Sequence, residues 1–262
     1  MEKRKVALVL GGGGARGVAH IGAIEALEEA GFEITAVAGT SMGALVGGMY
    51  AAGHLDLFKE WMCELDRYKV LSLVDFTFSA EGLVKGNRVI QALKQLVPDV
   101  RIEELPIPFA AVAADLMTGR EVVFDRGGLY DAIRASISIP SVFQPMRMGD
   151  MVLIDGGTVN PLPLNRVRRR SGELLVAVDV SASFSAQERS SVNYYKLITS
   201  SSEIMQQRIA QLMCRLYKPD VLIEIPADSF GLFEFYRATE IAEAGRRTME
   251  ASLQRSLALA EI

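Results

Sequence analysis

The sequence predicts an α/β protein, a three-layer α/β/α sandwich with a central, mostly parallel sheet. Short apolar runs alternate along the chain with segments in which apolar residues recur every three or four positions. Strands that alternate with helices in this way form parallel sheets with helices on both faces. Two runs, FAAVAAD (109–115) and ELLVAVDV (173–180), are almost continuously apolar, which is typical of strands buried on both faces.

The individual elements follow from these two periodicities. The expected strands are, in chain order, Val6 to Leu10, Ile34 to Gly39, Phe109 to Asp115, Glu121 to Phe124, Met151 to Asp155, Leu174 to Val180 and Asp220 to Ile225. The expected helices are Val18 to Ala30, Ala44 to Ala52, Leu55 to Lys69, Gly86 to Leu96, Tyr130 to Ile137, Tyr194 to Tyr217 and Glu234 to Leu259. Turn residues at Thr118-Gly119 and Gly149-Asp150 predict two antiparallel hairpins.

Composition limits the classes of function. Half of the 262 residues are hydrophobic, and we expect one domain over 1–262, with a core at 1–180 and C-terminal helices and a last strand at 190–262. The net charge of -4 gives no basic surplus of the kind that holds nucleic acid. Cys63 and Cys214 lack the spacing of a disulfide framework or a zinc site. No apolar run reaches the roughly 18 to 20 residues that cross a bilayer, so we expect a cytoplasmic protein.

The first expected strand runs into a glycine-rich loop, Gly11 to Gly14, and then into a helical pattern. A strand, a glycine turn and a helix N-terminus form an anion site whatever the anion is. A dinucleotide site would need an acidic residue at the end of the second strand, about 20 positions later, and a nucleotide phosphate loop would need a Lys-Ser or Lys-Thr pair. The second strand ends in glycine and no such pair follows, so both nucleotide interpretations fail.

The second expected strand ends in Gly39-Thr40-Ser41-Met42-Gly43, and a helical pattern follows at once. This is G-x-S-x-G between a strand and a helix, the context in which a tight turn exposes the serine hydroxyl as a nucleophile. Such a serine needs donors for the oxyanion that forms when it attacks a carbonyl. The backbone N–H groups of Gly12, Gly13 and Gly14 are the expected oxyanion hole.

The base that would activate Ser41 is a separate problem, because the chain contains two histidines and both fall in or beside helices. We expect His20 to pack under the glycine loop rather than to act in a triad. Asp155 closes an expected buried strand and is followed by Gly156 and Gly157. It could act as the base if burial raised its pKa, or it could simply cap the following turn; the residues alone leave both readings open.

Together, GGGGARG at Gly11 to Gly17, GTSMG at Gly39 to Gly43 and DGG at Asp155 to Gly157 resemble the motifs of the patatin-like phospholipases, in their small bacterial branch. The stretches AIRASISIP and DGGTVNPLP carry the same resemblance, which covers most of the chain up to about Val180.

The resemblance implies a patatin-like fold and a carboxylic-ester hydrolase that acts on lipids through a Ser41–Asp155 dyad, with no metal or organic cofactor. Arg16 and Met42 are further candidate substrate-binding residues. Arg16 could face a phosphate head group or pair with a carboxylate at the sheet edge. The expected partner is a lipid or other acyl ester.

Several alternatives stay open at this level. An acyl-binding regulatory protein and an acyltransferase would both use the same pocket. The run Arg166 to Arg170 is expected to be a solvated helix end, with attraction to anionic lipid at the inner membrane face as the alternative. The aromatic segment Phe230 to Tyr236 is expected to line a core or pocket rather than touch a membrane. The loops 71–85 and 181–191 are either lids or ordinary loops.

Overall fold

The computed structural model describes residues 3–73, 76–79, 82–182, 194–227 and 229–260. Its main sheet has the strand order β10-β9-β1-β2-β5-β8-β7, with β6 paired to β5 beside this path, and β3 and β4 form a separate hairpin. The strands are β1 (Arg4–Leu10), β2 (Phe32–Thr40), β3 (Phe76–Ser79), β4 (Gly82–Val84), β5 (Phe109–Asp115), β6 (Glu121–Phe124), β7 (Met146–Met148), β8 (Met151–Asp155), β9 (Leu174–Ala182) and β10 (Val221–Pro226).

Pairing in the main sheet is parallel from β10 through β9, β1 and β2 to β5. The remaining pairs, β5 with β6, β5 with β8 and β7 with β8, are antiparallel. The β5–β6 and β7–β8 hairpins confirm the two turns expected from the sequence. The carboxyl ends of the parallel strands β1 and β2 therefore lie beside the end of β8, where Asp155 is.

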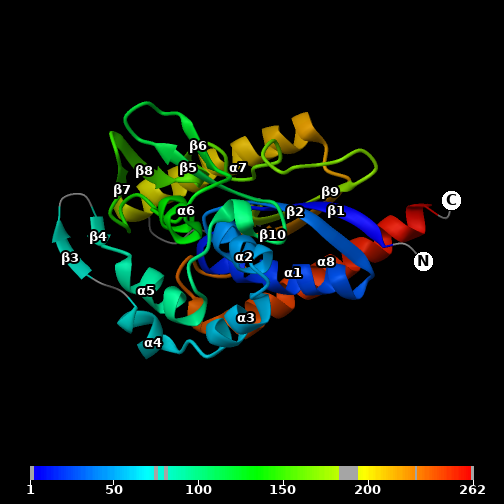
Figure 1. Ribbon diagram of the computed structural model, residues 1–262, viewed down its shortest axis with the longest axis horizontal. Helices are drawn as coiled ribbons and strands as arrows, with labels where there is room; N and C mark the ends of the chain where they lie inside the picture. The colour runs from blue at the N-terminus through cyan, green and yellow to red at the C-terminus, as the bar shows by residue number, and fades with distance from the viewer. Residues whose placement is uncertain (1–2, 74–75, 80–81, 183–193, 228, 261–262) are drawn as a thin grey trace.

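The helices cover both faces of the sheet (Figure 1). They are α1 (Ala19–Glu29), α2 (Met42–Ala51), α3 (Leu55–Cys63), α4 (Arg67–Ser72), α5 (Asn87–Leu96), α6 (Leu129–Ser136), α7 (Tyr194–Tyr217) and α8 (Ala238–Ala260), with short 3-10 turns η1 (Gly14–Val18), η2 (Ile102–Glu104), η3 (Gly156–Thr158) and η4 (Phe235–Arg237). In Figure 1, α1, α3 and α8 lie below the sheet and α7 lies above it. The α/β/α sandwich expected from the sequence is confirmed.

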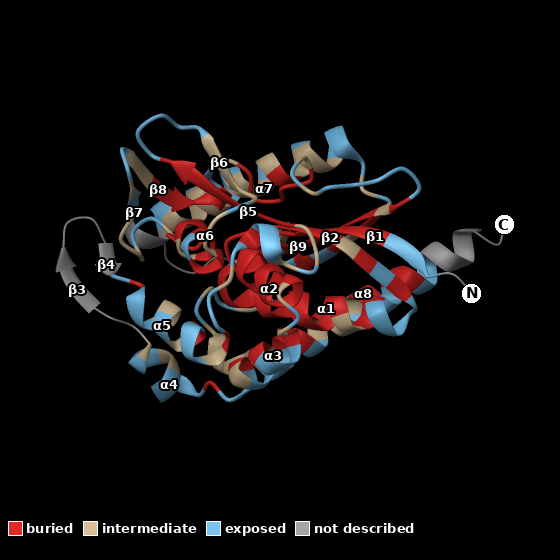
Figure 2. Cartoon of the chain, in the orientation of Figure 1, coloured by how far each residue is buried: buried red, intermediate tan, exposed pale blue. Residues whose placement is uncertain are grey.

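The alternation of side chains along β1 shows why helices cover both faces of the sheet. Val6, Leu8 and Leu10 belong to the large core cluster that includes residues of α1, α2 and α8. Ala7 and Val9 point to the opposite face, in a smaller cluster with Ala210 of α7. Because successive side chains of a strand point to opposite faces, an uninterrupted apolar run needs a helical layer on each side. Figure 2 shows this buried centre between exposed outer helix faces.

Three expectations need correction. The segment expected as one helix over Leu55 to Lys69 is two: α3 ends at Cys63, and Asp66 caps the start of α4 by accepting a hydrogen bond from Lys69 N–H. The stretch 71–85, expected as a loop or a lid, contains strands β3 and β4, and β7 completes the expected hairpin at Gly149-Asp150 although its three residues are too few for a strand pattern in the sequence. The run Arg166 to Arg170 is not helical.

Arg166, Arg168 and Arg169 of this run lie within ion-pair distance of carboxylates. Arg166 pairs with Glu121, and Arg169 pairs with Asp220 at 2.7 Å. The candidate lids at 71–85 and 181–191 fall partly outside the described residues, at 74–75, 80–81 and 183–191.

Helices α1 and α8 cross at very short range. A Cβ atom at Gly22 would overlap the carbonyl of Ala242, and one at Gly245 would overlap the carbonyl of Ala19. Each glycine therefore lets the other helix approach backbone to backbone. Within the described part of the chain, no helix is long and apolar enough to traverse a bilayer.

Candidate active site

Ser41 lies between β2 and α2 and is the N-cap residue of α2. Its backbone has φ 56° and ψ −123°, a conformation that is strained for a side chain larger than glycine. The flanking glycines permit the tight turn, because a Cβ at Gly39 would overlap Gly43 and a Cβ at Gly43 would overlap the carbonyl of Leu10. This is the strand–turn–helix context in which the sequence predicts a nucleophilic serine.

Two hydrogen bonds hold this turn from outside. The N–H of Ser41 donates to Ser136 Oγ at 2.8 Å, and the Ser136 hydroxyl donates to the carbonyl of Val112 at 2.6 Å. Thr40 Oγ1 donates to the carbonyl of Asn160 at 2.8 Å. Ser136 is not among the site residues predicted from the sequence. It lies in the stretch AIRASISIP, and no local pattern indicates which backbone it meets.

Asp155 ends β8 and faces Ser41. The hydroxyl of Ser41 donates to Asp155 Oδ2 at 2.5 Å, and the N–H of Gly157 donates to Oδ1 at 2.7 Å. The residue is 7% exposed. Burial raises the pKa of Asp155 to about 6, although both hydrogen bonds lower it. The carboxylate caps the turn with one oxygen and contacts the serine with the other, so this geometry is compatible with both interpretations left open by the sequence.

The glycine loop packs directly against the serine. A Cβ at Gly12 would lie 3.3 Å from Ser41 Cβ. The N–H of Gly12 donates to the carbonyl of Pro161 at 3.0 Å, so this donor is occupied. Among the described residues, no backbone acceptor is bonded to the N–H of Gly13 or of Gly14. Two of the three expected oxyanion donors are therefore available in this conformation.

His20 lies beneath the loop. Its ring Nε2–H donates to the carbonyl of Gly11 at 2.8 Å. The side chain is fully buried, and burial lowers its pKa to about 4, so the ring is neutral at pH 7. This contact matches the expected packing role under the loop.

The other carboxylates at strand ends bind the turns that follow them, and Asp115 also binds the neighbouring strand β8. Asp115 accepts hydrogen bonds from the Thr118 hydroxyl at 2.6 Å and from Val152 N–H at 3.2 Å. Asp179 accepts from Ser181 N–H at 2.9 Å. Asp155 differs from these two residues because one of its carboxylate oxygens accepts a hydrogen bond from the Ser41 hydroxyl.

Arg16 is buried beside the loop. Its Nη1 donates to the carbonyl of Ala227 at 2.5 Å, and its Nη2 lies 3.6 Å from the Glu203 carboxylate. Of the two interpretations of Arg16, the structure shows the pairing with a carboxylate, which belongs to α7 rather than to the sheet edge. Met42 opens α2 and lines an apolar cavity beside Ser41.

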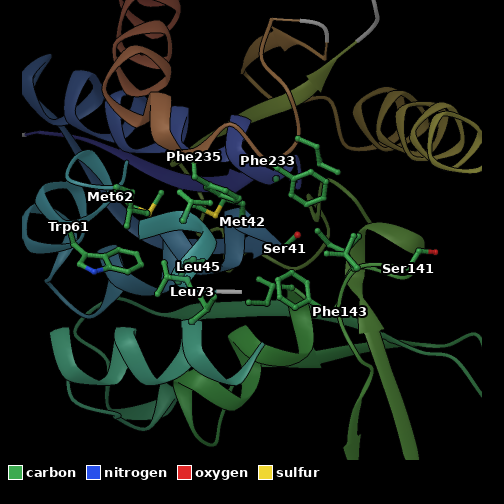
Figure 3. A pocket seen from close by; sticks show the side chains of 18 residues that line it. Ser41, Met42, Leu45, Trp61, Met62, Leu73, Ser141, Phe143, Phe233 and Phe235 are labelled. Atoms are coloured by element: carbon green, nitrogen blue, oxygen red, sulfur yellow. The ribbon is translucent and has the colours of Figure 1, made fainter. Parts of the chain in front are cut away.

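This apolar cavity has a volume of about 440 Å³ and reaches Ser41. Figure 3 shows apolar side chains from several segments gathered around it, with the Ser41 hydroxyl at its margin. They come from α2, α3, α4, α5, the segment 137–143, the loop before η4 and η4 itself, and include Met42, Leu45, Trp61, Met62, Val70, Leu232 and Phe235. The expectation that the aromatic segment lines a pocket is confirmed.

A second cavity, of about 160 Å³, also reaches Ser41; because more polar side chains line it than line the first, we call it the polar cavity. Its walls are the glycine loop, Asp155 and the inner face of α7, including Ser202, Glu203 and Gln206. None of these α7 residues was predicted from the sequence, because α7 lies more than 150 positions from the serine. The arrangement places a hydroxyl–carboxylate pair where an apolar and a polar cavity meet.

Comparison with known proteins shows the family to which the chain belongs. Residues 8–167 match the family model described as patatin-like phospholipase. The chain belongs to the patatin-like phospholipase family. The matched residues include the glycine loop, the serine turn and Asp155.

Relatives of this patatin-like chain come from bacteria and eukaryotes. An uncharacterized NTE family protein of Mycobacterium tuberculosis is 47% identical over 179 residues, which are 68% of this chain and 50% of the relative. A lysophospholipase of Saccharomyces cerevisiae is 32% identical over 202 residues, covering 74% of this chain and 12% of that protein. The chain therefore spans about half the length of its mycobacterial relative.

The crystal structure of VipD from Legionella pneumophila is similar in fold. The match has a TM-score of 0.50 at 15% identity and covers 96% of this chain and 67% of VipD. At this identity the likeness concerns the fold alone.

Proposed function

We propose that this patatin-like protein is a carboxylic-ester hydrolase that cleaves acyl esters of lipids, with Ser41 as nucleophile and Asp155 as general base. The observation that carries the proposal is the hydrogen bond of 2.5 Å from Ser41 Oγ to Asp155 Oδ2 at the junction of two cavities. Family membership supports the lipid acyl ester as substrate. The apolar cavity would hold the acyl chain.

In the first half-reaction, Ser41 Oγ would bond to the ester carbonyl carbon while its proton passes to Asp155 Oδ2. The tetrahedral intermediate would then lose its alkoxide, which leaves as the alcohol by taking the proton back from Asp155. In the second half-reaction, Asp155 would accept a proton from water as that water attacks the acyl-serine. Collapse would release the fatty acid and return the proton to Ser41.

Oxyanion stabilisation is assigned in this proposal to the N–H groups of Gly13 and Gly14. Gly13 precedes η1 and Gly14 is its first residue. Both N–H groups therefore lie at the positive end of this turn, which stabilises negative charge. Gly12 would help by its lack of a side chain, since it allows the loop to approach Ser41. Met42 would contact the acyl chain.

The charge state of Asp155 fits the role of base. With a pKa of about 6, the carboxyl is mostly ionised at pH 7, yet it is a stronger base than an exposed aspartate. Because the base must be ionised to accept the proton, acylation should increase as pH rises through about 6.

A fluorophosphonate probe and p-nitrophenyl esters test the proposal on three proteins. Wild type should take up the probe covalently and hydrolyse the esters, Ser41→Ala should do neither, and Asp155→Asn should lose about 10³-fold or more in kcat. The matched control is Asp115→Asn, the same change at the end of the neighbouring strand, where the carboxylate binds the turn after β5 and the N–H of Val152 on β8 rather than Ser41.

Contrary results are distinct. Equal labelling of wild type and Ser41→Ala would refute the nucleophile, and full activity in Asp155→Asn would refute the base. Tight binding of fatty acid without hydrolysis of any ester would identify an acyl-binding protein. Product analysis separates hydrolysis from acyl transfer, because transfer gives a new ester instead of free fatty acid.

A further inference from the structure

We propose that the polar cavity is a subsite for the leaving alcohol and that it selects a neutral, hydroxyl-bearing alcohol such as glycerol over one that carries a phosphate monoester. This inference rests on the proposed hydrolase function and names the class of substrate. It uses residues of α7 that neither the motifs nor the family match include.

The position of the cavity assigns it to the alcohol. Ser41 borders both cavities, and among the described residues that line the apolar one, Ser41, Ser141 and the indole N–H of Trp61 are the polar side-chain groups. The polar one contains Asp155, which must return a proton to the departing oxygen in the proposed mechanism. The alcohol side of the ester must therefore face this cavity.

The inner face of α7 supplies neutral hydrogen-bonding groups. Thr199, Ser202 and Gln206 line the cavity at helical spacing, and Gln206 Nε2 donates to Ser202 Oγ at 3.2 Å. Gln206 also reaches toward the base, since a Cβ at Gly157 would lie 3.0 Å from Gln206 Oε1. Amide and hydroxyl groups can each donate and accept, which suits the hydroxyls of a polyol.

The charges around the cavity disfavour an anion. Among its described lining residues, Arg16 is the cation, and Asp155 and Glu203 are the carboxylates. The Arg16 side chain is 4% exposed and already binds Ala227 and Glu203, whereas the Glu203 side chain is 29% exposed. A phosphate here would meet an accessible carboxylate and a guanidinium buried behind it. Like charges at short range in a partly dry site repel strongly.

The test compares two single-chain esters with the same oleoyl chain, 1-monooleoylglycerol and 1-oleoyl-lysophosphatidic acid, in identical mixed micelles. Wild type should show at least about tenfold higher kcat/KM for the neutral ester. Glu203→Gln should narrow this ratio to about threefold or less, because it removes the exposed carboxylate and frees Arg16 for the phosphate. The kcat/KM of each variant for the oleoyl esters is divided by its kcat/KM for p-nitrophenyl butyrate, which corrects for effects on the chemical step.

Two further variants test the hydrogen bonding of the alcohol and provide a charge-matched control. Gln206→Leu should lower kcat/KM for monooleoylglycerol by about tenfold relative to p-nitrophenyl butyrate, because a hydrogen-bonding partner of the alcohol is lost. Glu243→Gln removes an exposed carboxylate on α8 that pairs with Arg247, and it should leave the ratio of the two oleoyl esters unchanged.

Hydrolysis of both oleoyl esters at equal rates, or a preference for the anionic one, would overturn the subsite while leaving the hydrolase function intact. An unchanged ratio in Glu203→Gln would overturn the role of the carboxylate in selection. Absence of hydrolysis of every ester, including p-nitrophenyl butyrate, would overturn the proposed function and the subsite with it.

Discussion

Burial of the Asp155 carboxyl group makes the stability of the protein depend on pH. Its folded pKa of about 6 lies above the ordinary value of 3.8. A carboxyl with a raised folded pKa favours the folded state fully below the unfolded value, and this contribution is lost as pH rises through the folded value. The difference of about two pKa units corresponds to about 3 kcal/mol. At neutral pH the folded protein therefore carries a buried charge that opposes folding.

The Asp155→Asn variant should be more stable than wild type at pH 8 by about 1–3 kcal/mol, since the amide is not charged. The advantage should shrink as pH falls from 7 toward 4, where the wild-type carboxyl becomes protonated. Urea unfolding at several pH values measures the difference. A variant that is less stable than wild type at pH 8 by the same amount as at pH 4.5 would contradict the pKa assignment.

Among the elements, the turn between β2 and α2 depends on α6. The N–H of Ser41 and the carbonyl of Val112 both bond to the Ser136 hydroxyl, which is fully buried. A buried polar group that loses its partner costs about 1–3 kcal/mol. Ser136 thus acts as a positioning residue that keeps the strained serine in place from a helix about 95 positions away in sequence.

Ser136→Ala should lower kcat about tenfold or more with little change in KM, because the serine turn loses its support while both cavities keep their walls. Steady-state kinetics together with thermal unfolding measure the two effects. Ser138→Ala is the matched control, since its hydroxyl bonds to Arg134 and not to Ser41. An equal loss of kcat in both variants would show a general packing effect instead.

The elements also show how far the sequence alone could reach. Strand and helix periods placed most elements, and β5, β6, β8 and α7 match their expected bounds. The Ser41–Asp155 pairing was anticipated from the resemblance to the patatin-like phospholipases, because the residues alone left Asp155 open as a base or as a turn cap. Ser136, Glu203 and Gln206 could not be anticipated, since their proximity to the serine arises only from tertiary packing. The break between α3 and α4 was not predicted, because the helical pattern of apolar residues continues past Asp66, the residue that caps α4.

Over the whole molecule, the C-terminal segments complete a site whose motifs are N-terminal. The carbonyl of Leu232 accepts a hydrogen bond from Ala15 N–H at 2.9 Å, and the carbonyl of Ala227 holds Arg16. The helix that follows, α8, packs on α1 through Gly22 and Gly245. The glycine loop is therefore fixed from both ends of the chain.

Gly245→Val should destabilise the whole protein by about 3 kcal/mol or more, because the added side chain would overlap the backbone of α1. Thermal unfolding followed by the fluorescence of Trp61, the single tryptophan, reports this change beside the apolar cavity. The control Glu243→Val places the same side chain on the exposed face of α8 and should cost less than about 1 kcal/mol. Equal melting temperatures for the two variants would contradict the close packing.

The placement of Ser41 between two cavities has a kinetic consequence. In the proposed reaction, the alcohol can depart from its side while the acyl group stays bound to the enzyme on the other. The emptied polar chamber then becomes the route by which water arrives, so the same space would serve first as exit and then as entrance. Release of the two products would be ordered in time, with the fatty acid last.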